Sequence, residues 1–227
     1  MARKPYKEET HGSQKDLQLL ANKYPELLDL ELSEILHKTI KLIWHSPLES
    51  DEYAEYVDQD FINRLGIKEK ICLPLSDFWP KRGSNWDGLA TDGSMVFIME
   101  AKAHISEKKI ESTGASQKSL NLIEESLQKT KDFLNVTSDI SWCKDNYYQY
   151  ANRIAHLYYL REINHLDAHL LFIYFLNDNL GNNETKADWE HAIDEVYNSL
   201  KLKRKNNLSN YIHHVFIDTN IFKKREK

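Results

Sequence analysis

The sequence of 227 residues predicts a mixed α/β fold in which helices cover a central sheet. Three observations favour this class. Asp92-Gly93 lies between two apolar, strand-like segments, which is a strong signal for a β-hairpin. Ala168 to Leu176 is a continuous apolar run, typical of a strand that is buried on both faces. Helical spacing precedes and follows these segments, and strands followed by a helix and a strand indicate a mixed sheet.

The first half of the chain is expected to contain helices and then one strand before the hairpin. Pro47 should end the second helix, because a proline inside a helix breaks the backbone hydrogen bonding. Ser50 can cap the third helix, and Gly66 lies just past its end. Residues 1–47 are therefore interpreted as a helical extension and residues 48–227 as the core of a single domain. The expected helices are Lys15–Tyr24, Leu30–Trp44 and Asp51–Leu65, and the expected strand is Ile67–Leu75.

Helices and strands are expected to alternate in the second half of the chain. The predicted order for the whole chain is helices, three strands, helices, a strand, a helix and a last strand. The expected helices are Ser116–Leu134, Tyr147–Glu162 and Asp188–Leu202, and the expected strands are Ala168–Leu176 and Tyr211–Asp218.

Composition is that of an ordinary soluble protein, with 41% hydrophobic and 29% charged residues. No apolar run is long enough to span a bilayer, and Met1 to His11 lacks the apolar core of a secretory signal. The two cysteines, Cys72 and Cys143, form neither a disulfide framework nor a zinc motif. We therefore expect a cytoplasmic protein without a membrane partner.

The net charge of −5 does not favour a broad nucleic-acid-binding surface, because phosphate contacts need positive charge. Local clusters are sufficient for an enzyme, however, and Lys81-Arg82 leads directly into the acidic segment described next. The clusters at Lys201–Lys205 and Lys223–Arg225 are more simply a solvated helix end and a charged tail.

Three ionisable residues flank the predicted hairpin: Asp87, Glu100 and Lys102. Because strand side chains alternate, Glu100 and Lys102 share one face with the apolar residues Val96 and Ile98. Burying a carboxylate and an ammonium there costs solvation free energy, which a metal ion with a phosphate ligand would offset. The alternative is a solvent-facing pair with Asp87 as a turn residue. The apolar strand face argues against that alternative.

Asp87 together with Glu100-Ala101-Lys102 resembles the D…(D/E)xK signature of the PD-(D/E)XK nuclease superfamily. The chain from Trp44 to Asp178 also resembles a little-characterised bacterial group within that superfamily. The resemblance implies a restriction-endonuclease-like αβββαβ core and an endonuclease that hydrolyses phosphodiester bonds, with DNA as the expected partner. The resemblance to the bacterial group rests on further short segments of the sequence: Ser46-Pro47-Leu48, Tyr53-Ala54-Glu55-Tyr56, Phe78-Trp79-Pro80 and Ala103-His104.

The resemblance also implies a cofactor and residue roles. The carboxylates of Asp87 and Glu100 and the backbone carbonyl of Ala101 would bind Mg²⁺ or Mn²⁺, since these ions prefer hard oxygen ligands. Lys102 would orient or deprotonate the attacking water, or stabilise developing charge. Double-strand cleavage by this fold often uses two active sites, so the resemblance implies a homodimer.

Other candidate residues rest on weaker patterns. Glu55 lies on the helix expected before the first strand and would add a catalytic acid, with Glu34 as a weaker candidate; a solvated helix carboxylate is an equal alternative for Glu55. Several related nucleases place a glutamine from a downstream helix near the site. Gln149, with Asn152 and Arg153 on the same helical face, would take that role or contact phosphate, although such residues are more often simply surface. The remaining candidates are the phosphate contacts Lys81 and Arg82. Trp86 is most simply a core or rim aromatic, with stacking on a base as the alternative, and His104 either forms a hydrogen bond near the site or has a structural role.

Two other functions stay open. One is a nucleic-acid-binding or assembly protein that keeps the fold without turnover or needs a partner. The other is an RNA-directed nuclease that uses the same residues. No Walker-type loop, G-x-S-x-G elbow or dinucleotide fingerprint supports a different enzyme class.

Overall fold

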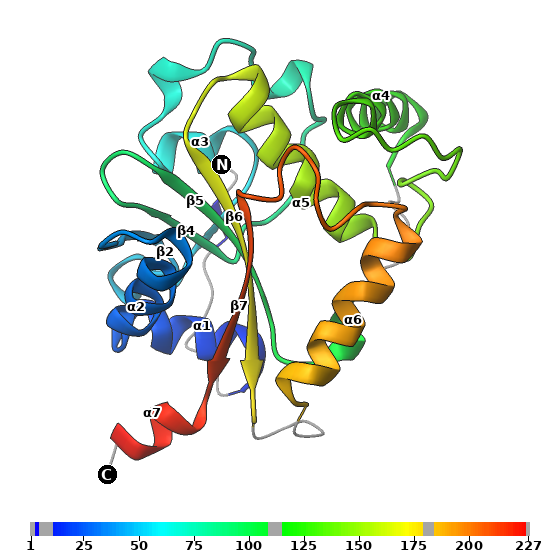
Figure 1. Cartoon of the computed structure of the whole chain (residues 1–227). Helices are drawn as coiled ribbons and strands as arrows, with labels where there is room; N and C mark the ends of the chain where they lie inside the picture. The colour runs from blue at the N-terminus through cyan, green and yellow to red at the C-terminus, as the bar shows by residue number, and fades with distance from the viewer. Residues whose placement is uncertain (1–2, 5–10, 109–114, 179–183, 226–227) are drawn as a thin grey trace.

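The computed structural model describes residues 3–4, 11–108, 115–178 and 184–225 (Figure 1). Its fold is mixed α/β, with a five-stranded sheet flanked by helices on both faces. The strand order is β2-β4-β5-β6-β7; the first three are antiparallel and the last three parallel. A small second sheet pairs β1 with β3. The strands are β1 (Arg3–Lys4), β2 (Ile43–Ser46), β3 (Glu55–Tyr56), β4 (Gly88–Thr91), β5 (Val96–Lys102), β6 (Ala168–Leu176) and β7 (Ile212–Asp218).

Two groups of helices cover the two faces of the sheet. Helices α1, α2 and α7 share one hydrophobic cluster with one sheet face, whereas α3, α4, α5 and α6 share the other cluster with the opposite face. The helices are α1 (Gly12–Asn22), α2 (Pro25–Leu36), α3 (Asp58–Arg64), α4 (Gln117–Phe133), α5 (Tyr148–Tyr158), α6 (Lys186–Ser199) and α7 (Asn220–Arg225). A π-helical turn at Tyr159–Ile163 extends α5, and 3₁₀ turns occur at Glu49–Asp51, Lys68–Lys70, Leu75–Asp77 and Ile105–Lys108.

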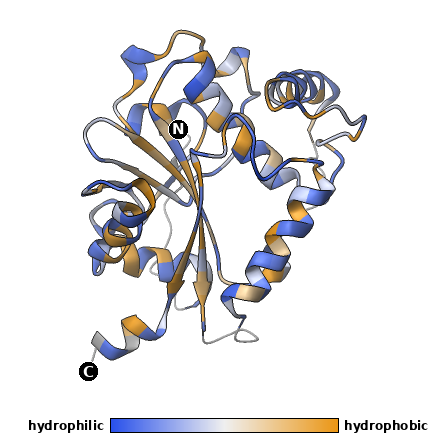
Figure 2. Cartoon of the chain, viewed as in Figure 1, coloured by the Kyte–Doolittle hydropathy of each residue, from blue (hydrophilic) through white to orange (hydrophobic). Residues whose placement is uncertain are grey.

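The hairpin and the central strands form as their sequence pattern predicts. Gly93 has a φ of 92°, which glycine adopts without strain, and the Asp92 carboxylate accepts hydrogen bonds from the next backbone N–H groups. Every residue of β5 is buried, with Val96 and Ile98 in one cluster and Phe97 in the other. Figure 2 shows the hydrophobic residues concentrated along the strands of the sheet. The expected alternation of faces is therefore confirmed.

The prediction of one helix from Leu30 to Trp44 is wrong, because α2 ends at Leu36. His37 adopts a left-handed conformation, with a φ of 52°, and turns the chain away from the helix axis. The Asp29 side chain then accepts a hydrogen bond from the Leu42 N–H, at 2.9 Å, and fixes the return of the chain. The chain continues as β2, an edge strand of the central sheet. Residues 1–47 are thus not a purely helical extension.

The expected helix Asp51–Leu65 is only half present. Backbone conformations with positive φ at Glu52 and Tyr53 interrupt it, and the chain passes through β3 before α3 begins at Asp58. Ser50 therefore does not cap a helix; the residue before α3 is Val57. The cause lies in tertiary pairing, because β3 pairs with β1 and bridges to Trp86.

The expected strand Ile67–Leu75 is also wrong. This segment forms 3₁₀ turns, and the side chain of Asn164 accepts hydrogen bonds from the N–H groups of Cys72 and Leu73, at 2.8 and 3.0 Å.

The three helices and two strands expected after residue 115 are confirmed, and their ends agree with the prediction to within three residues. For α5 this agreement includes the π-helical turn that extends the helix. No helix in the described part of the chain is long and apolar enough to cross a membrane.

Candidate active site

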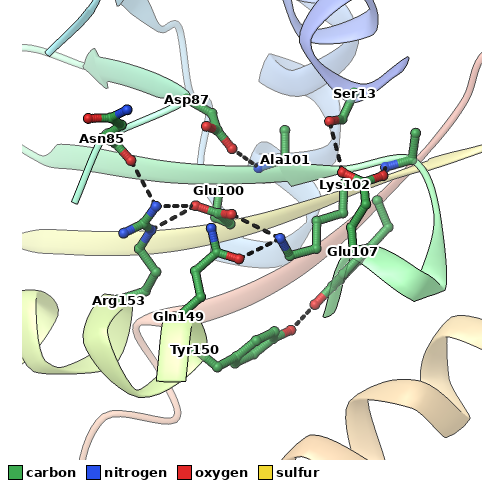
Figure 3. Close-up of polar contacts among 12 residues, drawn as sticks. Ser13, Asn85, Asp87, Glu100, Ala101, Lys102, Glu107, Gln149, Tyr150 and Arg153 are labelled. Carbon is green, nitrogen blue, oxygen red and sulfur yellow. Dashed lines mark hydrogen bonds and ion pairs between the residues drawn. The ribbon is translucent and has the colours of Figure 1, made fainter. Parts of the chain in front are cut away.

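The residues of the D…ExK pattern come together at the end of β5 (Figure 3). Gly88 of β4 pairs with Met99 of β5, so the antiparallel register brings Asp87 opposite Glu100. The Asp87 carboxylate accepts a hydrogen bond from the Ala101 N–H, at 2.8 Å. Gly88 permits the close approach, because a Cβ there would lie 3.0 Å from the Met99 sulfur. The hairpin therefore positions the aspartate against the ExK strand.

Glu100 and Lys102 form the centre of a buried ionic network. Lys102 Nζ lies 3.0 Å from Glu100 Oε1 and donates to Gln149 Oε1 at 2.7 Å. Arg153 bonds the other carboxylate oxygen, Glu100 Oε2, through Nε at 2.7 Å and Nη2 at 2.6 Å. The exposed fractions of Glu100, Lys102 and Arg153 are 2%, 3% and 4%. The carboxylate of Glu100 is thus enclosed by two cations of the protein itself.

Helix α5 supplies the partners of both ExK residues. Gln149 and Arg153 are four residues apart, so both project from the same helical face toward β5. Asn152, which the sequence placed on the same face, instead contacts Ser84. Helical spacing placed these polar residues on one face of α5, but their burial against the sheet, and which of them reach Glu100, depend on how the helix docks.

Trp86 is part of the core and does not form a platform for a base. Its side chain is fully buried and packs against Phe61 and His156. The guanidinium of Arg153 lies over the Trp86 ring, 4.7 Å from the ring centre, and donates to the Asn85 carbonyl at 2.8 Å. Trp86 therefore supports the site from behind, because it fixes the position of the arginine.

Glu55 reaches the site from β3 and not from a helix. The antiparallel bridge between Tyr56 and Trp86 brings the preceding Glu55 beside Asp87. Gln14 of α1 donates to Glu55 Oε1 at 2.9 Å, a contact that no sequence pattern indicated. Glu34 is exposed on α2.

The pKa values of the two acidic residues of the motif, Asp87 and Glu100, are shifted in opposite directions. Burial, followed by the negative charges of Glu100 and Glu55, raises the pKa of Asp87 well above its usual value. Burial also acts to raise the pKa of Glu100, but Arg153 and Lys102 outweigh it and hold that pKa below its usual value. Asp87 is half-buried as a whole residue, whereas Glu100 is buried.

The oxygen donors fit a small, hard divalent cation in their chemistry. Asp87, Glu55 and Glu100 supply carboxylates, and Ala101 supplies a backbone carbonyl between the motif residues. Asp87 and Glu55 also line a cavity of ≈ 10 Å³ beside α1, about the room that one water occupies. Within the described residues, no group of three or more His, Cys, Asp or Glu side chains is arranged to hold a metal ion. A cation at Glu100 would first have to replace one of its ionic partners.

The other predicted residues lie outside this network. Lys81 and Arg82 are exposed in the loop before Asp87, and the Asp58 carboxylate holds that loop by accepting from the Arg82 N–H at 3.0 Å. His104 Nε2 lies 3.4 Å from a carboxylate oxygen of Asp178, so it has a local polar partner.

Comparison with known proteins adds no relative. No family model, no curated protein and no solved structure matches this chain.

Proposed function

We propose that this protein is a divalent-metal-dependent nuclease that hydrolyses phosphodiester bonds of nucleic acid, with DNA as the first substrate to test. The observation that carries the proposal is the convergence of Asp87, Glu100 and Lys102, from two strands, with Gln149 and Arg153 of α5. If the short β3 and α3 between β2 and β4 are treated as an insertion, the order α1–α2, β2, β4, β5, α4–α5 and β6 supports the αβββαβ order that the family resemblance implies.

Each group has a part in that reaction. A bound Mg²⁺ or Mn²⁺ would supply an acidified water and neutralise charge on the phosphate. Lys102 has three donors, and the two that Glu100 and Gln149 accept fix the direction of the third. Its ammonium is therefore positioned to orient the attacking water or to stabilise negative charge. Burial strengthens this effect, because electrostatic interactions are stronger away from bulk water.

The proposal is tested by nicking of supercoiled plasmid DNA with Mg²⁺ or Mn²⁺. We expect Glu100→Gln and Lys102→Ala each to lower the nicking rate by roughly 100-fold or more, because each removes a charge that acts on the phosphate or water. Glu190→Gln and Lys203→Ala are matched controls at exposed positions and should leave the rate unchanged. Nicking at the wild-type rate by both Glu100→Gln and Lys102→Ala would disprove the site assignment. A parallel assay with RNA separates a DNA-directed from an RNA-directed enzyme.

One observation favours a second candidate, a nucleic-acid-binding or assembly protein without turnover. Both oxygens of Glu100 already contact cations of the protein, which leaves the acid satisfied without a metal. Isothermal titration with Mn²⁺ discriminates between the two functions. Binding that disappears in Asp87→Asn and in Glu100→Gln supports the nuclease, and no binding by the wild type either with or without DNA supports the second candidate.

A further inference from the structure

Glu100 and Arg153 are ionic partners inside the protein, away from solvent. The Arg153 guanidinium contacts Glu100 Oε2 with two nitrogens, at 2.7 and 2.6 Å, and both side chains are almost completely buried. Removing the partner of a buried charge is costly, because the remaining charge has neither water nor a counter-ion. Whatever binds one member of this pair therefore affects the other.

A metal ion and a phosphate would each take a different member of the pair. A divalent cation binds the Glu100 carboxylate, which releases Arg153 from its counter-ion. A phosphate oxygen binds the Arg153 guanidinium, which releases Glu100. The metal alone leaves the buried charge of Arg153 without its counter-ion, and the phosphate alone leaves Glu100 with Lys102 but without Arg153. Both ligands together provide a new partner for each.

We propose that Arg153 couples the binding of metal and nucleic acid: in the ligand-free protein it occupies Glu100 in place of the metal, and in the loaded site it binds the substrate phosphate. This inference rests on the proposed function. By thermodynamic linkage, the nucleic acid should tighten metal binding by the same factor as the metal tightens nucleic-acid binding. The site would then assemble its metal only when substrate is present.

The surroundings of Arg153 allow a change of partner without loss of position. The Asn85 carbonyl accepts from Nη2 at 2.8 Å, and the Trp86 ring lies under the guanidinium. Neither contact depends on Glu100. Asn85 and Trp86 directly precede Asp87, so an arginine held by them stays next to the acidic group. Lys102 remains as a second cation at Glu100 Oε1 in either state.

The test is titration of the protein with Mn²⁺, with and without a short DNA duplex that carries phosphorothioate linkages to slow cleavage. For the wild type we expect the duplex to tighten the Mn²⁺ Kd by roughly 10-fold or more. For Arg153→Gln we expect tighter Mn²⁺ binding than the wild type when no DNA is present, and a duplex effect within about 2-fold. Arg204→Gln is the matched control, because Arg204 also pairs with a carboxylate, Asp194, and lies over an aromatic ring.

A second variant keeps the test decisive if Arg153→Gln does not fold. Arg153→Lys keeps the positive charge but has a single ammonium, which cannot contact Glu100 and Asn85 as a planar guanidinium does. Its Mn²⁺ Kd without DNA should lie between those of the wild type and Arg153→Gln, and thermal unfolding reports whether each variant is folded. If Arg153→Gln does not fold, the lysine variant decides.

The outcomes separate this inference from the proposed function. A wild type that nicks DNA, with Mn²⁺ affinity no tighter in the folded Arg153 variants, overturns the coupling and leaves the nuclease in place. A wild type that neither binds Mn²⁺ nor nicks DNA overturns both. Equal duplex effects in the wild type and Arg153→Gln also overturn the coupling, because Arg153 then contributes nothing to it.

Discussion

His156 lies behind the candidate site, in an aromatic cluster with Trp79 and Trp86. Its ring is almost completely buried, and Nδ1 lies 2.9 Å from the Asn152 carbonyl, so this nitrogen donates when the ring is neutral. Burial is the main cause that lowers the pKa of His156 to about 4; the backbone hydrogen bond to Asn152 acts to raise this pKa, and the nearby charge of Arg153 acts to lower it. The neutral ring is therefore the form that the folded protein stabilises.

This histidine should make the fold sensitive to acid. Its pKa is about 6.5 when unfolded and about 4 when folded, so its contribution is complete above pH 6.5 and is lost as the pH falls toward 4. The loss amounts to about 3 kcal/mol of unfolding free energy. Urea unfolding of the wild type and His156→Phe at pH 7 and pH 4.5 measures it. We expect a smaller decrease in the variant, and equal decreases in both proteins would contradict the prediction.

At the scale of elements, Asn164 holds the segment that the sequence predicts as a strand. Its side-chain oxygen accepts from the N–H groups of Cys72 and Leu73, and its Nδ2 donates to the Tyr159 carbonyl at 2.9 Å. A side chain thus replaces the neighbouring strand that this segment would otherwise need. Hydrophobic alternation alone does not reveal such a substitute partner.

Loss of the Asn164 side chain should destabilise the fold. Asn164→Ala removes three hydrogen bonds of a buried residue, and we expect a loss of about 1–3 kcal/mol in unfolding free energy. Asn164→Asp keeps an oxygen acceptor for Cys72 and Leu73 and should lose less at neutral pH. Chemical denaturation compares the two. If Asn164→Ala is as stable as the wild type, the side chain does not hold the segment.

Across the whole molecule, the sheet separates two hydrophobic clusters, and the N-terminal helices α1 and α2 contribute to one of them. Leu17 of α1 belongs to the cluster with Phe97 and Leu171, while Leu170 of β6 belongs to the other. Adjacent residues of one strand pack into opposite clusters, so the two clusters share the strands of the sheet. The N-terminal helices are therefore an integral layer that covers a sheet face.

This arrangement predicts one cooperative unfolding transition. Leu17→Ala and Leu170→Ala each truncate a leucine that is at most 1% exposed, and each should lower the unfolding free energy by about 2–5 kcal/mol. In urea titrations both should move the same single transition with an unchanged slope. A separate early transition in Leu17→Ala, with the main transition unmoved, would instead mean that the helices unfold as an independent extension.

The sequence by itself determined the features that depend on residues close together in the chain, namely strand alternation, the hairpin turn and helical periodicity. Strand alternation placed Glu100 and Lys102 on one face, and Asp-Gly located the hairpin that brings Asp87 to them. Periodicity also located α4, α5, β6, α6 and β7, because each is long and strongly patterned.

Only the tertiary structure decided the contacts between distant segments. It placed Glu55 on β3, paired Gln14 with it, buried Trp86 and joined Arg153 to Glu100. The physical reason is that these features depend on docking and strand pairing, whose free energy comes from residues far apart in the chain. Short segments with weak patterns, such as Ile43–Ser46, take their conformation from the partner they meet.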